Sequence, residues 1–235
     1  MKLWGYLGTL GWAGLALLLG QFVALAVVVW WARVSLHAVL DTPYDGAVVT
    51  LFILISNAIT IAVVVLAVRL KRDNVAAYLA LNGADSHYVA AGILGIAVLI
   101  AGTDALLYLG GRPLVTPFQL QSYTTSVAEG WLPAMLAATI LVAPAGEEIL
   151  FRGFLFRGLA RTERSTWPAI VVISLLWAGL HIQYDWTGIL QIFVTGLFLG
   201  WLRWRSASVL LTFALHALFN LEGTIETVLK VKYFS

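Results

Sequence analysis

The sequence predicts an all-α membrane protein, a polytopic bundle of about seven spanning helices. Of the 235 residues, 61% are hydrophobic and only 11% are charged, and the mean hydropathy is +0.91. Soluble chains carry roughly 45–50% apolar and about 25% charged residues, so the charged side chains here are too few to cover a surface that faces water. Lipid is therefore the expected solvent for most of the surface.

The apolar runs are long enough to cross a bilayer, which takes roughly 20 residues of helix. The first run ends in Trp30, Trp31 and Arg33, which is typical of a retained span with an interfacial anchor and not of a cleaved signal peptide. No internal repeat is visible, so residues 1–235 are expected to form a single membrane domain. We count seven spans, with six or eight as alternatives because the fifth and sixth are short. The candidates cover residues 10–32, 47–69, 88–109, 131–156, 167–182, 187–202 and 208–228.

Basic residues predict the orientation of this bundle. With a cytoplasmic N-terminus, most lysines and arginines fall on the cytoplasmic side, as the positive-inside rule requires. The net charge of +2 is too small to indicate a nucleic-acid partner, and the absence of cysteine excludes a thiol nucleophile. The residues expected on the cytoplasmic side are Lys2, Arg69, Lys71, Arg72, Arg157, Arg161, Arg164, Arg203 and Arg205.

Two connections between the spans carry local signals. Residues 73–83 begin with Asp and end with Gly, which predicts a short interfacial helix. Residues 110–130 are long for a bundle connection, and they are expected to form either a lid or a solvated loop.

Ionisable side chains inside the predicted spans are few, and each costs several kcal/mol on simple scales. Glu148 and Arg152 are four residues apart, a spacing that favours an ion pair on one helix face. Neighbouring residues of a helix point about 100° apart, so Glu147 must find its partners on other helices or in water. Pro144 is expected to kink the helix just before these acids, beside a water-filled pocket.

Two later spans carry one polar face each, with Trp177 and His181 on one and His216 and Asn220 on the other. At about 1.5 Å per residue, their depths overlap with that of Glu147, so one pocket could hold them all. A desolvated carboxylate can take a proton from water and return it to a leaving amine, while carboxamide groups stabilise an oxyanion. Alternatively, Glu147, His181 and His216 could bind Zn²⁺ or another divalent metal that activates the water.

Three motifs in this region together resemble those of a known family. They are EExxxR from Glu147 to Arg152, a near match to FxxxH from Trp177 to His181, and HxxxN from His216 to Asn220. In this order they resemble the CPBP family, the CAAX prenyl endopeptidase and bacteriocin-processing membrane proteins also called Abi. The resemblance covers about residues 131–222, which we expect to be the catalytic core.

The resemblance implies an intramembrane endopeptidase of a kind often classed as a metalloprotease. Glu147 would activate water with assistance from His181, and His216 with Asn220 would stabilise the oxyanion. Its substrates would be membrane-associated proteins or peptides, including prenylated CAAX proteins, and its location would be a prokaryotic plasma membrane.

The remaining motif residues would support this chemistry. Glu148 and Arg152 would hold the first motif in place, and Trp177 stands where the family pattern has Phe, so the larger ring would narrow the pocket. The alternative from another class is a non-catalytic membrane scaffold or bacteriocin-immunity factor of the same fold. A proton-coupled carrier is disfavoured, because carriers usually contain a pseudo-symmetric repeat.

Overall fold

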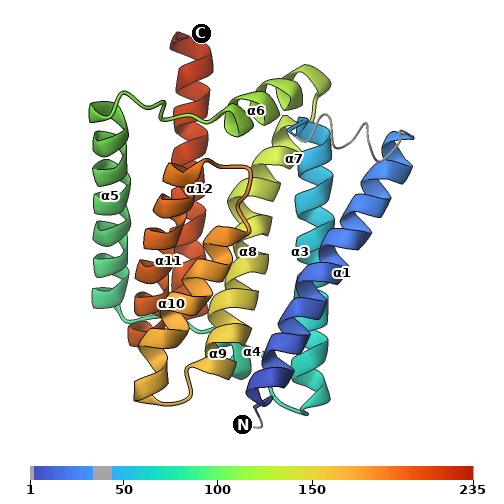
Figure 1. The fold of residues 1–235 in the computed structure, drawn as a ribbon, viewed down its shortest axis with the longest axis vertical. Helices are drawn as coiled ribbons and strands as arrows, with labels where there is room; N and C mark the ends of the chain where they lie inside the picture. Colours follow the sequence, from blue (N-terminus) through green and yellow to red (C-terminus); the bar gives the residue numbers. More distant parts are fainter. Residues whose placement is uncertain (1–2, 34–43, 235) are drawn as a thin grey trace.

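Long helices run up and down the molecule in the computed structural model, which describes residues 3–33 and 44–234 (Figure 1). All regular structure in those two ranges is helical, which confirms the predicted all-α class. Lys2 lies outside the described residues. Besides one composite helix, the described elements are α1 (Tyr6–Ala32), α3 (Gly46–Leu70), α4 (Val75–Leu79), α5 (Ser86–Leu109), α6 (Pro117–Glu129), α10 (Glu163–Gly179), α11 (Trp186–Ser206) and α12 (Val209–Tyr233).

A helix is present at each of the seven predicted spans, but the count of seven spans is not confirmed. Five helical segments of the described chain are long and apolar enough to cross a membrane: α1, α3, α5, the composite segment Leu132–Leu159, and α11. Helix α10 has only 17 residues, and the second half of α12 carries charged side chains. The chain is therefore a polytopic helical protein with five candidate spans by length and composition.

The composite helix replaces the single kinked span expected at residues 131–156. It consists of α7 (Leu132–Ala137), a π-helical stretch, α8 (Ala143–Glu148), a second π-helical stretch, and α9 (Phe156–Leu159). Pro144 lies in the first turn of α8. The expected disruption is thus present as a change of helix type, and π-helical turns occur frequently at functional sites. The two π-helical stretches are Ala138–Val142 and Ile149–Leu155.

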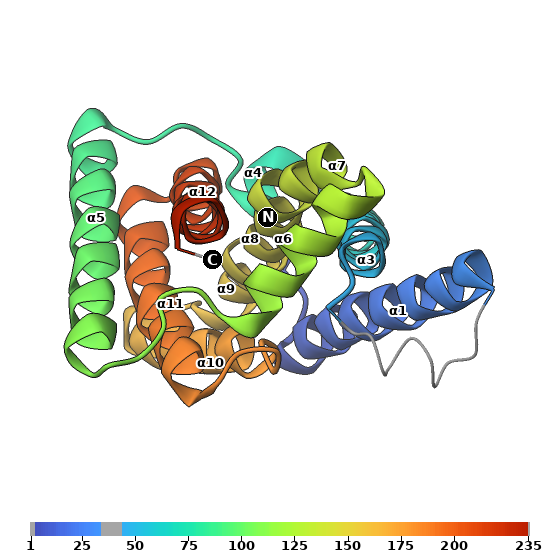
Figure 2. The ribbon, with the colours of Figure 1, turned by 90° about the horizontal axis from the view of Figure 1, so that it is seen from above.

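The composite helix lies at the centre of the bundle, with α1 and α5 at opposite edges (Figure 2). Its second π-helical stretch is almost wholly buried. The aromatic side chains of this stretch, Phe151 and Phe154, belong to the hydrophobic core. Leu199 of α11 and Leu215 of α12 belong to the same core. By contrast, only 11% of the most apolar window of α5 is buried, as expected for a helix whose main neighbour is lipid.

The long connection after α5 contains α6, which lies across one end of the bundle (Figure 1). The Thr116 hydroxyl accepts a hydrogen bond from the backbone N–H of Gln119, whose side chain accepts one from the backbone of Thr116. Pro117 occupies the first turn, where a missing N–H costs nothing. Both start signals are present in the sequence. Of the two alternatives for residues 110–130, the solvated loop is wrong for residues 117–129, and the lid stays a prediction.

The other predicted connection is confirmed as a short helix. It is α4, which begins after Asn74, whose side chain accepts a hydrogen bond from the backbone N–H of Ala77. The helix ends at Ala80 in the left-handed conformation. The backbone carbonyl of Ala80 then accepts a hydrogen bond from the N–H of Val209, which fixes α4 against the start of α12.

Candidate active site

Glu147 on α8 faces polar groups from two other helices. Its Oε2 accepts a hydrogen bond of 2.5 Å from the indole N–H of Trp177 on α10. The same oxygen lies 4.0 Å from Nε2 of His181, which directly follows α10, and 4.0 Å from Nε2 of His216 on α12. The side chain of Glu147 is 23% exposed and that of His181 is 18% exposed, so both can be reached from outside the protein.

The two histidines present the same ring nitrogen to Glu147. Nδ1 of His181 lies 2.8 Å from the backbone carbonyl of Trp177, and Nδ1 of His216 lies 3.1 Å from Oε1 of Glu148. Both partners are acceptors, so each Nδ1 carries the hydrogen, and Nε2 is the atom left to face Glu147. A separation of 4.0 Å is too long for a direct hydrogen bond but suits a bridging water molecule.

Glu148 and Arg152 form the buried ion pair that their spacing predicts. Nη1 of Arg152 lies 2.9 Å from Oε1 of Glu148, and the two side chains are 1% and 0% exposed. Arg152 also donates to the backbone carbonyl of Gly196 on α11, and its guanidinium lies 4.3 Å from the centre of the Trp177 ring. These contacts balance the two buried charges, and they join α8, the second π-helical stretch, α10 and α11 around the site.

Asn220 meets a backbone carbonyl that Pro144 leaves without a partner. The N–H of Ala143 donates to the carbonyl of Ala138, five residues earlier, in the π-helical pattern. The next carbonyl, that of Thr139, would be served by residue 144, but proline has no N–H. The side-chain amide of Asn220 donates to this carbonyl at 2.8 Å, so it replaces the missing bond and ties α12 to the composite helix.

The arrangement around Glu147 fits a water-activating carboxylate and does not fit a metal ion held by Glu147, His181 and His216. A cation bound there would have to sit between the two imidazoles and Oε2. The donor atoms of these three residues do not all come within 4.8 Å of one another. The metal alternative raised by the sequence therefore loses its geometric support.

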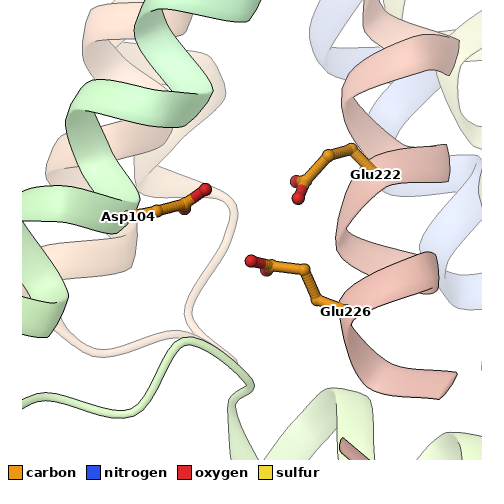
Figure 3. Close-up of side chains that lie close together, drawn as sticks. All are labelled: Asp104, Glu222 and Glu226. Atoms are coloured by element: carbon orange, nitrogen blue, oxygen red, sulfur yellow. The ribbon is translucent and has the colours of Figure 1, made fainter. Parts of the chain in front are cut away.

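A second acidic group lies apart from this site, between α5 and α12. The carboxyl groups of Asp104, Glu222 and Glu226 point toward one another across the gap between the two helices (Figure 3). One ligand atom from each lies within 4.8 Å of those from the other two, and no other group of this kind occurs in the part of the chain that the structure describes. The i, i+4 spacing of the two glutamates is the sequence signal that points to it.

Comparison with known proteins agrees with the motif assignment. Residues 129–221 match the family model described as type II CAAX prenyl endopeptidase Rce1-like. No curated protein and no solved structure matches the chain. The matched segment begins just before α7, ends within α12, and contains all the residues assembled around Glu147. The match supports assigning residues 129–221 to the CPBP family of membrane proteins.

Proposed function

We propose that the protein is an intramembrane endopeptidase that hydrolyses peptide bonds of membrane-associated substrates with water activated by Glu147. The observation that carries this proposal is the position of the Glu147 carboxylate. It faces the Trp177 indole N–H on α10, Nε2 of His181 just after α10, and Nε2 of His216 on α12. The family match supports prenylated CAAX-type proteins as the substrate class.

In the proposed reaction, one water molecule lies between Glu147 and Nε2 of His181, which accepts a hydrogen bond from it. Glu147 takes the other proton of the water as the water oxygen attacks the carbonyl carbon of the substrate. The same carboxyl then gives this proton to the amide nitrogen as the C–N bond breaks. This cycle uses one water molecule for each peptide bond and returns Glu147 to its starting state.

His216 and Asn220 are the proposed partners of the tetrahedral oxyanion. They lie four residues apart on one face of α12. Nε2 of His216 would donate in the imidazolium form, in which the ring has taken a second proton from solvent and keeps it throughout the cycle. A carboxamide has two N–H groups. One of those on Asn220 goes to the Thr139 carbonyl, so the second would contact the oxyanion. Preorganised donors of this kind stabilise the transition state because they need no rearrangement during the reaction.

The proposed orientation places the N-terminus in the cytoplasm. The ends of α3, α9 and α11 and the start of α10 all lie at the same end of the bundle as the N-terminus (Figure 1). These positions carry most of the basic residues, such as Lys71, Arg164 and Arg205, which supports a cytoplasmic location for this end.

The test is cleavage of a farnesylated CAAX-type peptide by the purified protein in liposomes. Replacing Glu147→Gln removes the base but keeps the side-chain size, and the cleavage rate should fall about 10³-fold. The matched control is Glu163→Gln, an exposed acid in the first turn of α10, which should cleave at the wild-type rate. Equal cleavage by wild type and Glu147→Gln would refute the proposal. Binding of the peptide without any cleavage by wild type would favour the scaffold alternative.

A further inference from the structure

We infer that Trp177 is a positioning residue for the catalytic base, holding Glu147 with its side chain and His181 with its backbone. This inference rests on the proposed function and assigns a role to the residue at which the chain departs from the family motif. The Trp177 ring would then position Glu147 as well as narrow the pocket.

The contact between Trp177 and Glu147 is specific in its direction. The indole Nε1–H is the only polar group of the Trp177 side chain, and it can donate but cannot accept a hydrogen bond. It donates to Oε2 of Glu147 at 2.5 Å, from a residue 30 positions away in the chain. A phenylalanine ring in this place has no hydrogen to donate. The hydrogen bond is therefore a property of this chain that an aromatic wall alone would not supply.

The Trp177 ring is held from several sides, so its N–H has a fixed direction. The residue is 2% exposed, and the guanidinium of Arg152 lies 4.3 Å from its ring centre. The edges of His216 and His181 meet the ring at centroid distances of 5.1 and 5.5 Å. At Gly196 of α11, an added Cβ would lie only 3.1 Å from the ring. A ring confined in this way can hold a flexible glutamate in one orientation.

The backbone of Trp177 completes the arrangement. Its carbonyl accepts the hydrogen bond from Nδ1 of His181 at 2.8 Å, which directs Nε2 of that ring toward Glu147. One residue thus sets the position of the base and of the imidazole that assists it.

The test compares Trp177→Phe with Trp167→Phe, the same replacement on the same helix at a side that is 49% exposed. With the farnesylated peptide in liposomes, Trp177→Phe should lower kcat about tenfold and leave KM within about twofold, because it misplaces the base without removing it. Trp167→Phe should match wild type in both kcat and KM.

Two outcomes would overturn the inference. An unchanged kcat with an altered KM would mean that the ring serves only as a pocket wall. A lower thermal midpoint with the same kcat and KM would mean that it serves only packing.

A measurement without substrate separates this inference from the proposed function. In protein labelled with ¹⁵N-tryptophan, the indole N–H signal of Trp177, assigned as the signal lost in Trp177→Phe, should lie downfield of the other nine. It should move in Glu147→Gln and stay in place in Glu163→Gln. A signal that is insensitive to Glu147→Gln would refute the positioning role even if wild type cleaves the peptide. A signal that shifts in protein that never cleaves would refute the proposed function and leave the contact established.

Discussion

Nδ1 of His216 lies 3.1 Å from Oε1 of Glu148, the same oxygen that accepts a hydrogen bond from Arg152. This contact joins α12 to α8 in the interior, and it places the other nitrogen of the ring toward Glu147. The two neighbouring glutamates therefore have different environments. Glu148 is fully buried between two donors, whereas Glu147 is partly exposed and faces Trp177 and the two imidazole Nε2 atoms.

We predict that Glu148→Gln destabilises the protein much more than Glu147→Gln. Removing the buried carboxylate leaves the charge of Arg152 without its counter-ion and weakens the bond to His216, and breaking a buried ion pair costs about 3 kcal/mol. Thermal melts in detergent should show a midpoint lower by roughly 5–10 °C for Glu148→Gln and nearly unchanged for Glu147→Gln. The reverse order would contradict the structural role of Glu148.

Asn220 should contribute to stability through its hydrogen bond to the Thr139 carbonyl, which has no backbone donor because residue 144 is proline. Asn220→Leu keeps the side-chain size but leaves the Thr139 carbonyl without a hydrogen-bond donor. This should lower the free energy of unfolding by about 1–3 kcal/mol. In a Pro144→Ala background, the backbone N–H gained at position 144 can donate to that carbonyl. Asn220→Leu should therefore lower the free energy of unfolding by less. A double-mutant cycle on thermal stability should give a coupling of about 1 kcal/mol. No coupling, together with an unchanged melting midpoint for Asn220→Leu, would leave Asn220 with a role in catalysis alone.

Removal of divalent metals should leave cleavage unchanged. The ligand atoms of Glu147, His181 and His216 do not all lie within 4.8 Å of one another, so these residues do not form a compact set of metal ligands. The measurement is the rate of peptide cleavage before and after dialysis against a chelator, with elemental analysis of the purified protein. Loss of activity that Zn²⁺ restores would show that the metal alternative is correct.

Asp185 should give the protein a stability contribution that depends on pH. The Thr187 hydroxyl, followed by the Gly188 backbone N–H and the charge of Arg112, holds the pKa of Asp185 below its usual range. The ionised carboxylate therefore stabilises the fold fully above about pH 4, and this contribution disappears as the pH falls through the lowered pKa. Because both Asp185 and Arg112 are exposed, the charge contribution should be below about 1 kcal/mol.

The replacement Asp185→Asn tests this, because asparagine still caps α11 but carries no charge. The variant should be less stable than wild type at pH 7, and the two should converge below the folded pKa. The control is Asp85→Asn, whose side chain starts α5 without a capping hydrogen bond. A gap between wild type and Asp185→Asn that stays constant from pH 7 to pH 3 would contradict the assignment.

Local features of the sequence were enough to predict much of this architecture. The apolar runs predicted a helix at each long segment, because a backbone in lipid must satisfy its hydrogen bonds internally. The i, i+4 spacing of Glu148 and Arg152 predicted their ion pair, since that spacing alone places two side chains together on a helix. By contrast, α6 was not predicted. Residues 110–130 were expected to form a lid or a solvated loop because of their length, and the capping signals of Thr116 and Pro117 were not used.

Composition, apolar length and motif order by themselves determined that this is a helical membrane protein with a polar cluster in its C-terminal half. Only the tertiary structure decided which atoms of that cluster meet. His216 contacts Glu148 as well as facing Glu147, and Trp177 donates to Glu147, because α10 and α12 pack against the composite helix in one particular rotation. Spacing along a helix sets which side chains share a face. The rotation and depth of each helix against its neighbours depend on contacts between residues far apart in the chain, and no local pattern contains that information.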